Sequence, residues 1–122
     1  MSDPYLDVFA RDYMLAALFT TDPDPGQGEY AEHDDWTIDN IAPEAYDAMV
    51  KDCLSFMDAC WDDIHLDLAH AGRDFWYTRN GHGCGFWDGD WPEAIGGRLT
   101  YACKAYGEQD LYLGDDGRLY VS

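Results

Sequence analysis

Basic residues are scarce in this chain. Its 122 residues include 7 Lys and Arg against 25 Asp and Glu, which gives a formal net charge of −18. Nucleic acids and anionic membranes are polyanions, so direct binding to either is not expected. The imbalance is uneven, because residues 1–63 contain 16 acids and two bases whereas residues 64–122 contain nine acids and five bases. The acidic surface is therefore expected in the N-terminal half.

Long apolar runs, a basic leader and metal-ligand motifs are also lacking. No stretch of about 18 apolar residues predicts a transmembrane helix, and Met-Ser-Asp-Pro at the start is not the basic region of a secretory signal, so a cytoplasmic location is expected. There is no HExxH motif, no complete calcium loop and no CxxC spacing among Cys53, Cys60, Cys84 and Cys103. We expect free thiols and no metal or cofactor, with a disulfide framework or a structural zinc as less favoured alternatives.

Two proline-led segments predict helices in the N-terminal half. Asp3-Pro4 supplies a capping carboxylate and a first-turn proline, and the apolar residues that follow recur at helical spacing, which predicts a helix over residues 4–19. Pro43 begins a second helix, whose wide apolar stripe continues to Ile64. Residues 20–40 are rich in Asp, Pro and Gly and are expected to form an acidic loop, either functional or partly disordered.

A β-hairpin is expected in the middle of the chain. Residues 65–72 read as a short helix or turn that ends at Gly72. Asn80-Gly81 then lies at the centre of residues 74–89, and this dipeptide is typical of a type I′ turn, whose two central residues both need a positive φ. Two strands meeting at this turn are therefore predicted.

The C-terminal part predicts one more helix and a second hairpin. The helix starts at Trp91-Pro92-Glu93 and has a plausible stop at Gly107, and the hairpin turns at residues 114–117. The sequence thus predicts a single α+β domain over residues 1–122. It has two N-terminal helices, a β-hairpin, a third helix and a C-terminal β-hairpin, with the helices packed on one face of a small antiparallel sheet.

The predicted central hairpin would place Arg79, His82 and Cys84 on one face. A Cys–His pair with a nearby arginine is a candidate for nucleophilic catalysis. However, no orienting acid or oxyanion loop accompanies the pair, and a flat strand face is not a pocket. We therefore favour a structural hairpin over an enzyme site.

The central segment also carries a resemblance. Residues 74–88 read DFWYTRNGHGCGFWD, and the tail contains Leu99-Thr100, Ala105-Tyr106-Gly107 and GDDGRLY at residues 114–120. These motifs resemble a family of small uncharacterised proteins from phages and related mobile elements, over roughly residues 36–121. The chain departs from the family at Arg73, where a histidine is more usual. The resemblance implies a phage-like setting and supplies no catalytic residues.

The acidic N-terminal half suggests a function. Helical carboxylates three or four residues apart stand about 5–6 Å from each other, and duplex phosphates also repeat at a few ångströms. We therefore expect a binding protein, not an enzyme, that inhibits a basic nucleic-acid-binding defence complex of a bacterial host (anti-CRISPR or anti-restriction) by occupying its DNA- or RNA-binding groove. The expected partner-binding residues are Asp34, Asp35, Glu44, Asp47, Asp58, Asp62 and Asp63.

Three alternatives stay open. The acids could be a solvated face that keeps the protein soluble, although a net charge of about 2–8 suffices for that. The Arg79, His82 and Cys84 face could belong to a small enzyme. Five Trp and nine Tyr are more than a small core needs, so the protein could also be an oligomerising structural protein. A homodimer is compatible with the inhibitor hypothesis.

Overall fold

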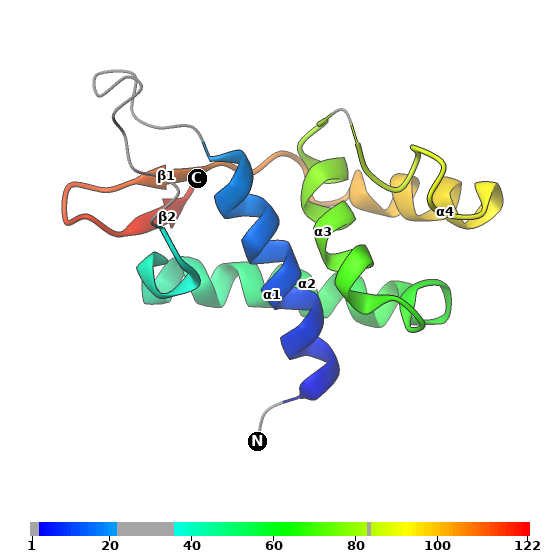
Figure 1. Cartoon of the computed structure of the whole chain (residues 1–122), viewed down its shortest axis with the longest axis horizontal. Coiled ribbons are helices and arrows are strands. Elements are labelled where there is room, and N and C mark those ends of the chain that lie inside the picture. Colours follow the sequence, from blue (N-terminus) through cyan, green and yellow to red (C-terminus); the bar gives the residue numbers. More distant parts are fainter. Residues whose placement is uncertain (1–2, 22–35, 83) are drawn as a thin grey trace.

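The computed structural model describes residues 3–21, 36–82 and 84–122. Its elements, in chain order, are the helices and strands α1 (Pro4–Thr20), the short 3-10 helix η3 (Ile38–Asn40), α2 (Pro43–Ile64), α3 (Leu68–Arg79), α4 (Glu93–Cys103), β1 (Leu111–Leu113) and β2 (Leu119–Val121). The α+β class is confirmed, and the described chain is mostly helical. In Figure 1, α1 and α3 lie side by side, α2 crosses behind them, and α4 and the β-hairpin lie toward opposite ends of the molecule.

The two N-terminal helices begin where the prolines predict. The Asp3 carboxylate accepts hydrogen bonds from the backbone N–H groups of Tyr5 (2.9 Å) and Leu6 (3.3 Å), which satisfies two amides that the first turn of α1 cannot pair internally. Pro4 and Pro43 are the first residues of α1 and α2. Of the predicted acidic loop at residues 20–40, residues 22–35 lie outside the described residues.

Aromatic side chains fill the core between α1, α2 and α3. Phe9, Tyr13, Phe56, Phe75 and Phe86 are all fully buried. The rings of Phe56 and Phe75 stack with centroids 4.1 Å apart, and Phe56 also stacks against Phe86 at 5.7 Å. Offset ring pairs of this kind add to the stabilisation that burial of the apolar area provides. The core is therefore built mainly from helix faces, with Phe86 added from the segment between α3 and α4.

Gly72 lets α1 and α3 approach closely. It lies within α3, and a Cβ placed on it would come 2.1 Å from the carbonyl oxygen of Phe9 in α1. No side chain fits into that space without moving a backbone. The prediction that a helix or turn ends at Gly72 is thus wrong, because the glycine serves the packing of two helices rather than a helix end.

The predicted hairpin at residues 74–89 is also wrong. Residues 74–79 belong to α3, and Asn80-Gly81 ends that helix. Asn80 has φ −99° and only Gly81 is left-handed, at φ +69°, whereas a type I′ turn needs both angles positive. The N–H of Gly81 donates to the Thr78 carbonyl (3.2 Å) and the N–H of His82 to the Tyr77 carbonyl (3.0 Å). This pair of bonds is the Schellman motif of a helix C-terminus.

The C-terminal hairpin is confirmed, but the helices do not pack on it as a layer. β1 and β2 pair antiparallel, with Tyr112 opposite Tyr120. The Ala42 N–H, at the start of α2, donates to the Leu119 carbonyl (2.8 Å) and ties β2 to the helices. α1 makes its most extensive contact with α3, so the helices form the core and the small sheet lies beside it. The helix predicted to start at residues 91–93 is α4, which ends at Cys103, ahead of the left-handed Gly107.

Candidate functional site

Four of the predicted partner-binding residues share the solvent face of α2. Glu44, Asp47, Asp58 and Asp62 are all exposed. At about 100° per residue their positions fall within roughly 60° of one another around the helix axis. The apolar residues of α2, such as Phe56, face the core on the other side. We call Glu44, Asp47, Asp58 and Asp62 the acidic face of α2.

In the described part of the chain, the carboxylates of the acidic face form no close ion pair, although one base lies among them. Among residues 3–21, 36–82 and 84–122, none of the four takes part in an ion pair. Lys51 lies on the same side of the helix, between a pair formed by Glu44 and Asp47 and a pair formed by Asp58 and Asp62. Asp47 and Asp58 are separated by about 16 Å along the axis, at 1.5 Å per residue. The face therefore presents two separated pairs of negative charge.

Asp63 differs from these four residues. It lies on another side of α2, where its carboxylate accepts two hydrogen bonds from the guanidinium of Arg98 in α4, at 2.7 and 3.1 Å. These hydrogen bonds lower the pKa of Asp63 below its ordinary value. The charge of Asp63 is thus already matched within the chain. Asp34 and Asp35 lie outside the described residues.

Arg79 is a buried structural centre and does not lie on an open face. Its guanidinium donates to the Tyr13 hydroxyl (2.9 Å), the Asp52 carboxylate (2.9 Å) and the backbone carbonyls of Tyr106 (3.0 Å) and Gly107 (2.9 Å). These four hydrogen bonds use four of the five N–H donors of the arginine side chain. The planar group also lies over the rings of Phe75 and Tyr106. Arg79 is thus buried and used mainly by contacts within the fold.

The shared face predicted for Arg79, His82 and Cys84 is absent because the hairpin is absent. His82 follows the end of α3 and packs edge-on against the ring of Tyr77. Cys84 is exposed, and desolvation together with the negative charges of Asp74 and Asp88 raises the pKa of its thiol. A raised pKa disfavours the thiolate that a cysteine nucleophile requires. The three residues therefore do not form the shared strand face on which the catalytic alternative depended.

A polar cluster that the sequence did not predict joins α3 to the segment before α4. Asp74 is 3% exposed and accepts a hydrogen bond from the indole N–H of Trp91 (2.8 Å). His70 stacks on Trp91, and its Nε2 lies 3.0 Å from an Asp74 carboxylate oxygen and 3.5 Å from one of Asp90, without the alignment of a hydrogen bond. Burial raises the pKa of Asp74. The spacing of His70 and Asp74, four residues apart, would have placed them on one helix face, had α3 been recognised.

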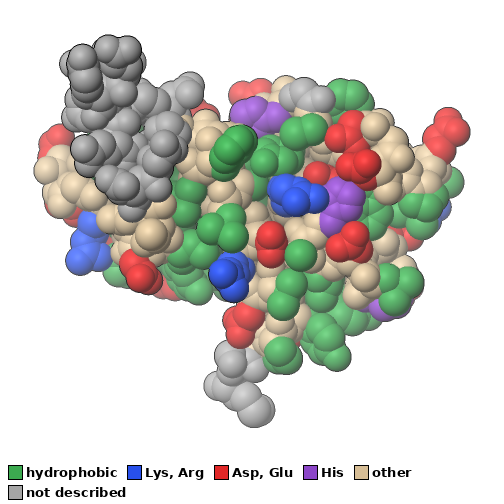
Figure 2. All heavy atoms as spheres, viewed as in Figure 1, with side chains coloured by type: hydrophobic (Ala, Val, Ile, Leu, Met, Phe, Trp, Pro, Cys, Tyr) green, Lys and Arg blue, Asp and Glu red, His purple; other side chains and the backbone are tan. Residues whose placement is uncertain are grey.

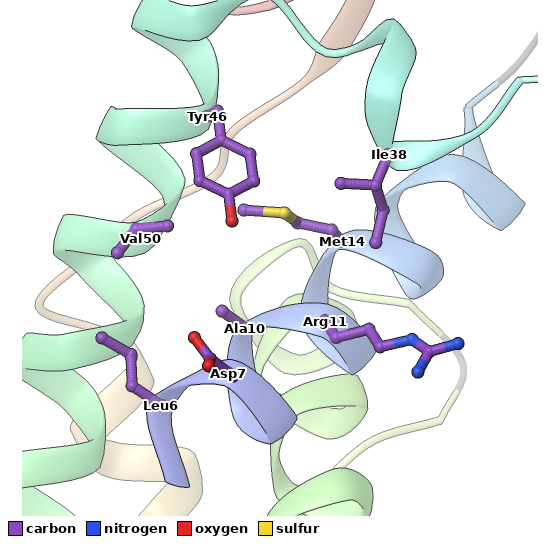
Figure 3. A pocket seen from close by; sticks show the side chains of 8 residues that line it. All are labelled: Leu6, Asp7, Ala10, Arg11, Met14, Ile38, Tyr46 and Val50. Atoms are coloured by element: carbon purple, nitrogen blue, oxygen red, sulfur yellow. The ribbon is translucent and has the colours of Figure 1, made fainter. Parts of the chain in front are cut away.

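A hollow lies beside α2, between α1, η3 and α2 (Figure 3). Its volume is about 300 Å³. Its walls are mostly apolar, and Asp7, Arg11 and the Tyr46 hydroxyl add polar groups. The lining residues are Leu6, Asp7, Ala10, Arg11, Met14, Ile38, Tyr46 and Val50. Val50 lies three residues after Asp47, and residues three apart are neighbours on a helix surface, so the acidic face borders the hollow.

Exposed apolar side chains continue along α1 outside this hollow. Figure 2 shows hydrophobic side chains on the face of the molecule where α1 lies, with charged side chains between them. Val8, Leu15 and Phe19 are 44%, 43% and 79% exposed. Single exposed apolar residues are ordinary on protein surfaces, so these alone do not define a site.

Neither a metal site nor a membrane span is found in the described part of the chain. Across residues 3–21, 36–82 and 84–122, no group of three or more His, Cys, Asp or Glu side chains could hold a metal ion. In the same residues, every helix is too short or too polar to cross a bilayer. Comparisons with protein-family models, with curated proteins and with solved structures gave no match.

Proposed function

We propose that the protein is a small acidic binding protein of phage type that inhibits a basic nucleic-acid-binding complex of its bacterial host, such as a CRISPR or restriction system, in the host cytoplasm. The observation that supports this proposal best is the acidic face of α2. Glu44, Asp47, Asp58 and Asp62 are exposed and unpaired within the described chain, whereas Asp52 and Asp63 on the same helix are matched by arginines. The unmatched carboxylates are available to the lysines and arginines of a partner.

The energetics of the free protein favour such a partner. Like charges three or four residues apart on a helix destabilise it by about 0.2–0.5 kcal/mol per pair, and the acidic face contains two such pairs, of which Lys51 offsets part through its position four residues after Asp47. A basic surface removes this repulsion on binding. A net charge of −18 also steers the protein toward a positive groove and accelerates association, an effect that falls steeply with ionic strength. Binding should therefore weaken as salt is added.

A pull-down with two variants of equal charge tests the proposal. The first replaces the acidic face by neutral isosteres: Glu44→Gln, Asp47→Asn, Asp58→Asn and Asp62→Asn. The control changes four exposed carboxylates elsewhere: Glu93→Gln, Glu108→Gln, Asp110→Asn and Asp115→Asn. Tagged proteins are incubated with lysate of bacteria that express several defence systems, and bound proteins are eluted with salt and identified by mass spectrometry.

Wild type and control should retain a nucleic-acid-binding complex that salt and duplex DNA release, and the acidic-face variant should lose it. Equal loss in both variants would show that only net charge matters and would argue against a defined face. Retention by the acidic-face variant would contradict the proposed site. A partner that DNA does not displace would contradict occupation of the nucleic-acid groove.

A further inference from the structure

The hollow between α1, η3 and α2 has the form of a pocket for one side chain. Ala10 and Met14 are buried in its wall, and Leu6, Ile38 and Val50 are half-buried around it. Small-molecule sites usually measure about 300–1,000 Å³, so a hollow of about 300 Å³ is at the lower limit. A space of this size suits an aliphatic or aromatic side chain better than a free, drug-sized ligand.

The charges around the hollow favour a cationic occupant. The lining itself has one carboxylate, Asp7, and one base, Arg11, but α1, η3 and α2 over their whole length carry nine carboxylates and two basic residues. Two of the nine, Asp52 and Asp63, are matched by arginines from other elements, which leaves a clear excess of negative charge. Figure 3 shows that the Arg11 guanidinium extends away from the hollow, whereas the Tyr46 hydroxyl points into it.

The polar groups at the rim are positioned to accept hydrogen bonds. Asp7 lines the hollow from α1 and, within the described residues, its carboxylate has no ion-pair partner. Asp47 adjoins the opposite wall and is exposed. An apolar side chain in the hollow would bring the residues that flank it in a partner to these two carboxylates. Interfaces commonly use this arrangement of an apolar anchor inside a polar rim.

We propose that the hollow is an anchor pocket for one apolar side chain of a lysine- or arginine-rich segment of the partner protein, with the basic residues of that segment on Asp7 and Asp47. This inference rests on the proposed function and specifies how the partner is held. An amphipathic basic helix is the segment that fits best, because helix-in-groove recognition places apolar anchors and charges on adjoining faces.

Two synthetic helical peptides rich in lysine and alanine test the pocket. They are identical except for one central residue, which is leucine in the first and alanine in the second. Their affinities are measured by fluorescence anisotropy at about 0.15 M ionic strength. Val50→Trp fills the hollow, and Leu15→Trp adds the same ring on an exposed part of α1 outside it. Circular dichroism checks that both variants are folded.

The wild type and Leu15→Trp should bind the leucine peptide about tenfold or more tightly than the alanine peptide, the lower end of what burial of a leucine contributes. Val50→Trp should bind both peptides equally. Equal binding of the two peptides by the wild type would overturn the anchor pocket, as would a preference that persists in Val50→Trp. Binding of neutral N-acetylleucinamide as tight as that of the leucine peptide would assign the hollow to a small molecule instead.

A further variant separates this inference from the proposed function. Asp58→Asn with Asp62→Asn should weaken the binding of both peptides by the same factor, because it removes charge from the acidic face and leaves the hollow intact. Peptide binding that depends on these acids but shows no preference for leucine would contradict the anchor pocket and leave the proposed function standing. Failure of both peptides to bind the wild type contradicts the recognition of basic partners itself.

Discussion

Replacement of Gly72 by alanine should destabilise the protein, although alanine is the better helix former. A Cβ at this position would lie 2.1 Å from the Phe9 carbonyl oxygen and 3.0 Å from its carbon. Both atoms are backbone, so α1 and α3 would have to separate by on the order of 1 Å to restore van der Waals contact. Overpacking of this kind costs about 3 kcal/mol, and helix propensity returns about 1 kcal/mol, which leaves a net loss of about 2 kcal/mol.

Urea unfolding followed by tryptophan fluorescence and circular dichroism measures this loss. Gly97→Ala is the matched control, because Gly97 lies in α4 and a Cβ there meets nothing within 4 Å. The control should become more stable by about 0.5–1 kcal/mol, the value of helix propensity alone. If Gly72→Ala were as stable as the wild type or more so, the close approach of α1 and α3 would be refuted.

Three more predictions concern a buried arginine, a buried carboxylate and the accessibility of two cysteines. Arg79→Met should lower the free energy of unfolding by about 3–5 kcal/mol, because it leaves the acceptors of the Arg79 hydrogen bonds unpaired. Arg98→Met, at a more exposed ion pair, should change it little, and urea unfolding of both variants measures the difference. Burial raises the pKa of Asp74 in the folded state. The contribution of its carboxyl group to stability is therefore present below the pKa of the unfolded chain and is lost as the pH rises through the pKa of the folded protein. The difference in free energy of unfolding between Asp74→Asn and the wild type, measured by urea unfolding, should therefore shift in favour of the variant when the pH is raised from below about 4 to 7. The same difference at both pH values would contradict this. Cys84 is exposed, whereas burial raises the pKa of Cys103 to about 12. A disulfide reagent at neutral pH should therefore label Cys84 first, and Cys84→Ser should remove this fast phase. Rapid labelling of Cys103 would be inconsistent with its burial.

The sequence predicted the elements whose signals are local. Asp3 and Pro4 mark the start of α1 through a cap and a fixed φ, and Pro43 marks α2 in the same way. The C-terminal hairpin followed from its glycine-rich turn. Each of these signals acts within a few residues and does not depend on a distant partner.

The middle of the chain was harder to predict, because the dipeptide Asn80-Gly81 is compatible with both a helix end and a hairpin turn. Glycine with a positive φ ends a helix as readily as it turns a hairpin, and Asn80-Gly81 occurs in both contexts. The spacing of Leu68, Ala71 and Phe75 fits one helix face and is the signal that would have favoured a helix here. Gly72 interrupts that pattern, and only its contact with Phe9 explains why a glycine is needed there.

The candidate site was predicted in part. Glu44, Asp47, Asp58 and Asp62, which the sequence predicts as partner-binding residues, are all exposed on one side of α2. The sequence could not show that Asp63 is held by Arg98, since that pair joins residues 35 positions apart. The hollow beside Tyr46 was likewise beyond the sequence, because it exists only where α1, η3 and α2 meet.

The hydrogen bonds of Arg79 and Ala42 also bear on how the chain folds during synthesis. Arg79 depends on the carbonyls of Tyr106 and Gly107, and Ala42 donates to Leu119. The first three helices therefore leave the ribosome before the residues that complete their hydrogen bonding. Translation adds roughly 5–20 residues per second, so this interval is on the order of seconds, during which the aromatic core is incompletely covered. Nascent chains stalled before Leu119 should therefore depend on chaperones more than the complete chain does.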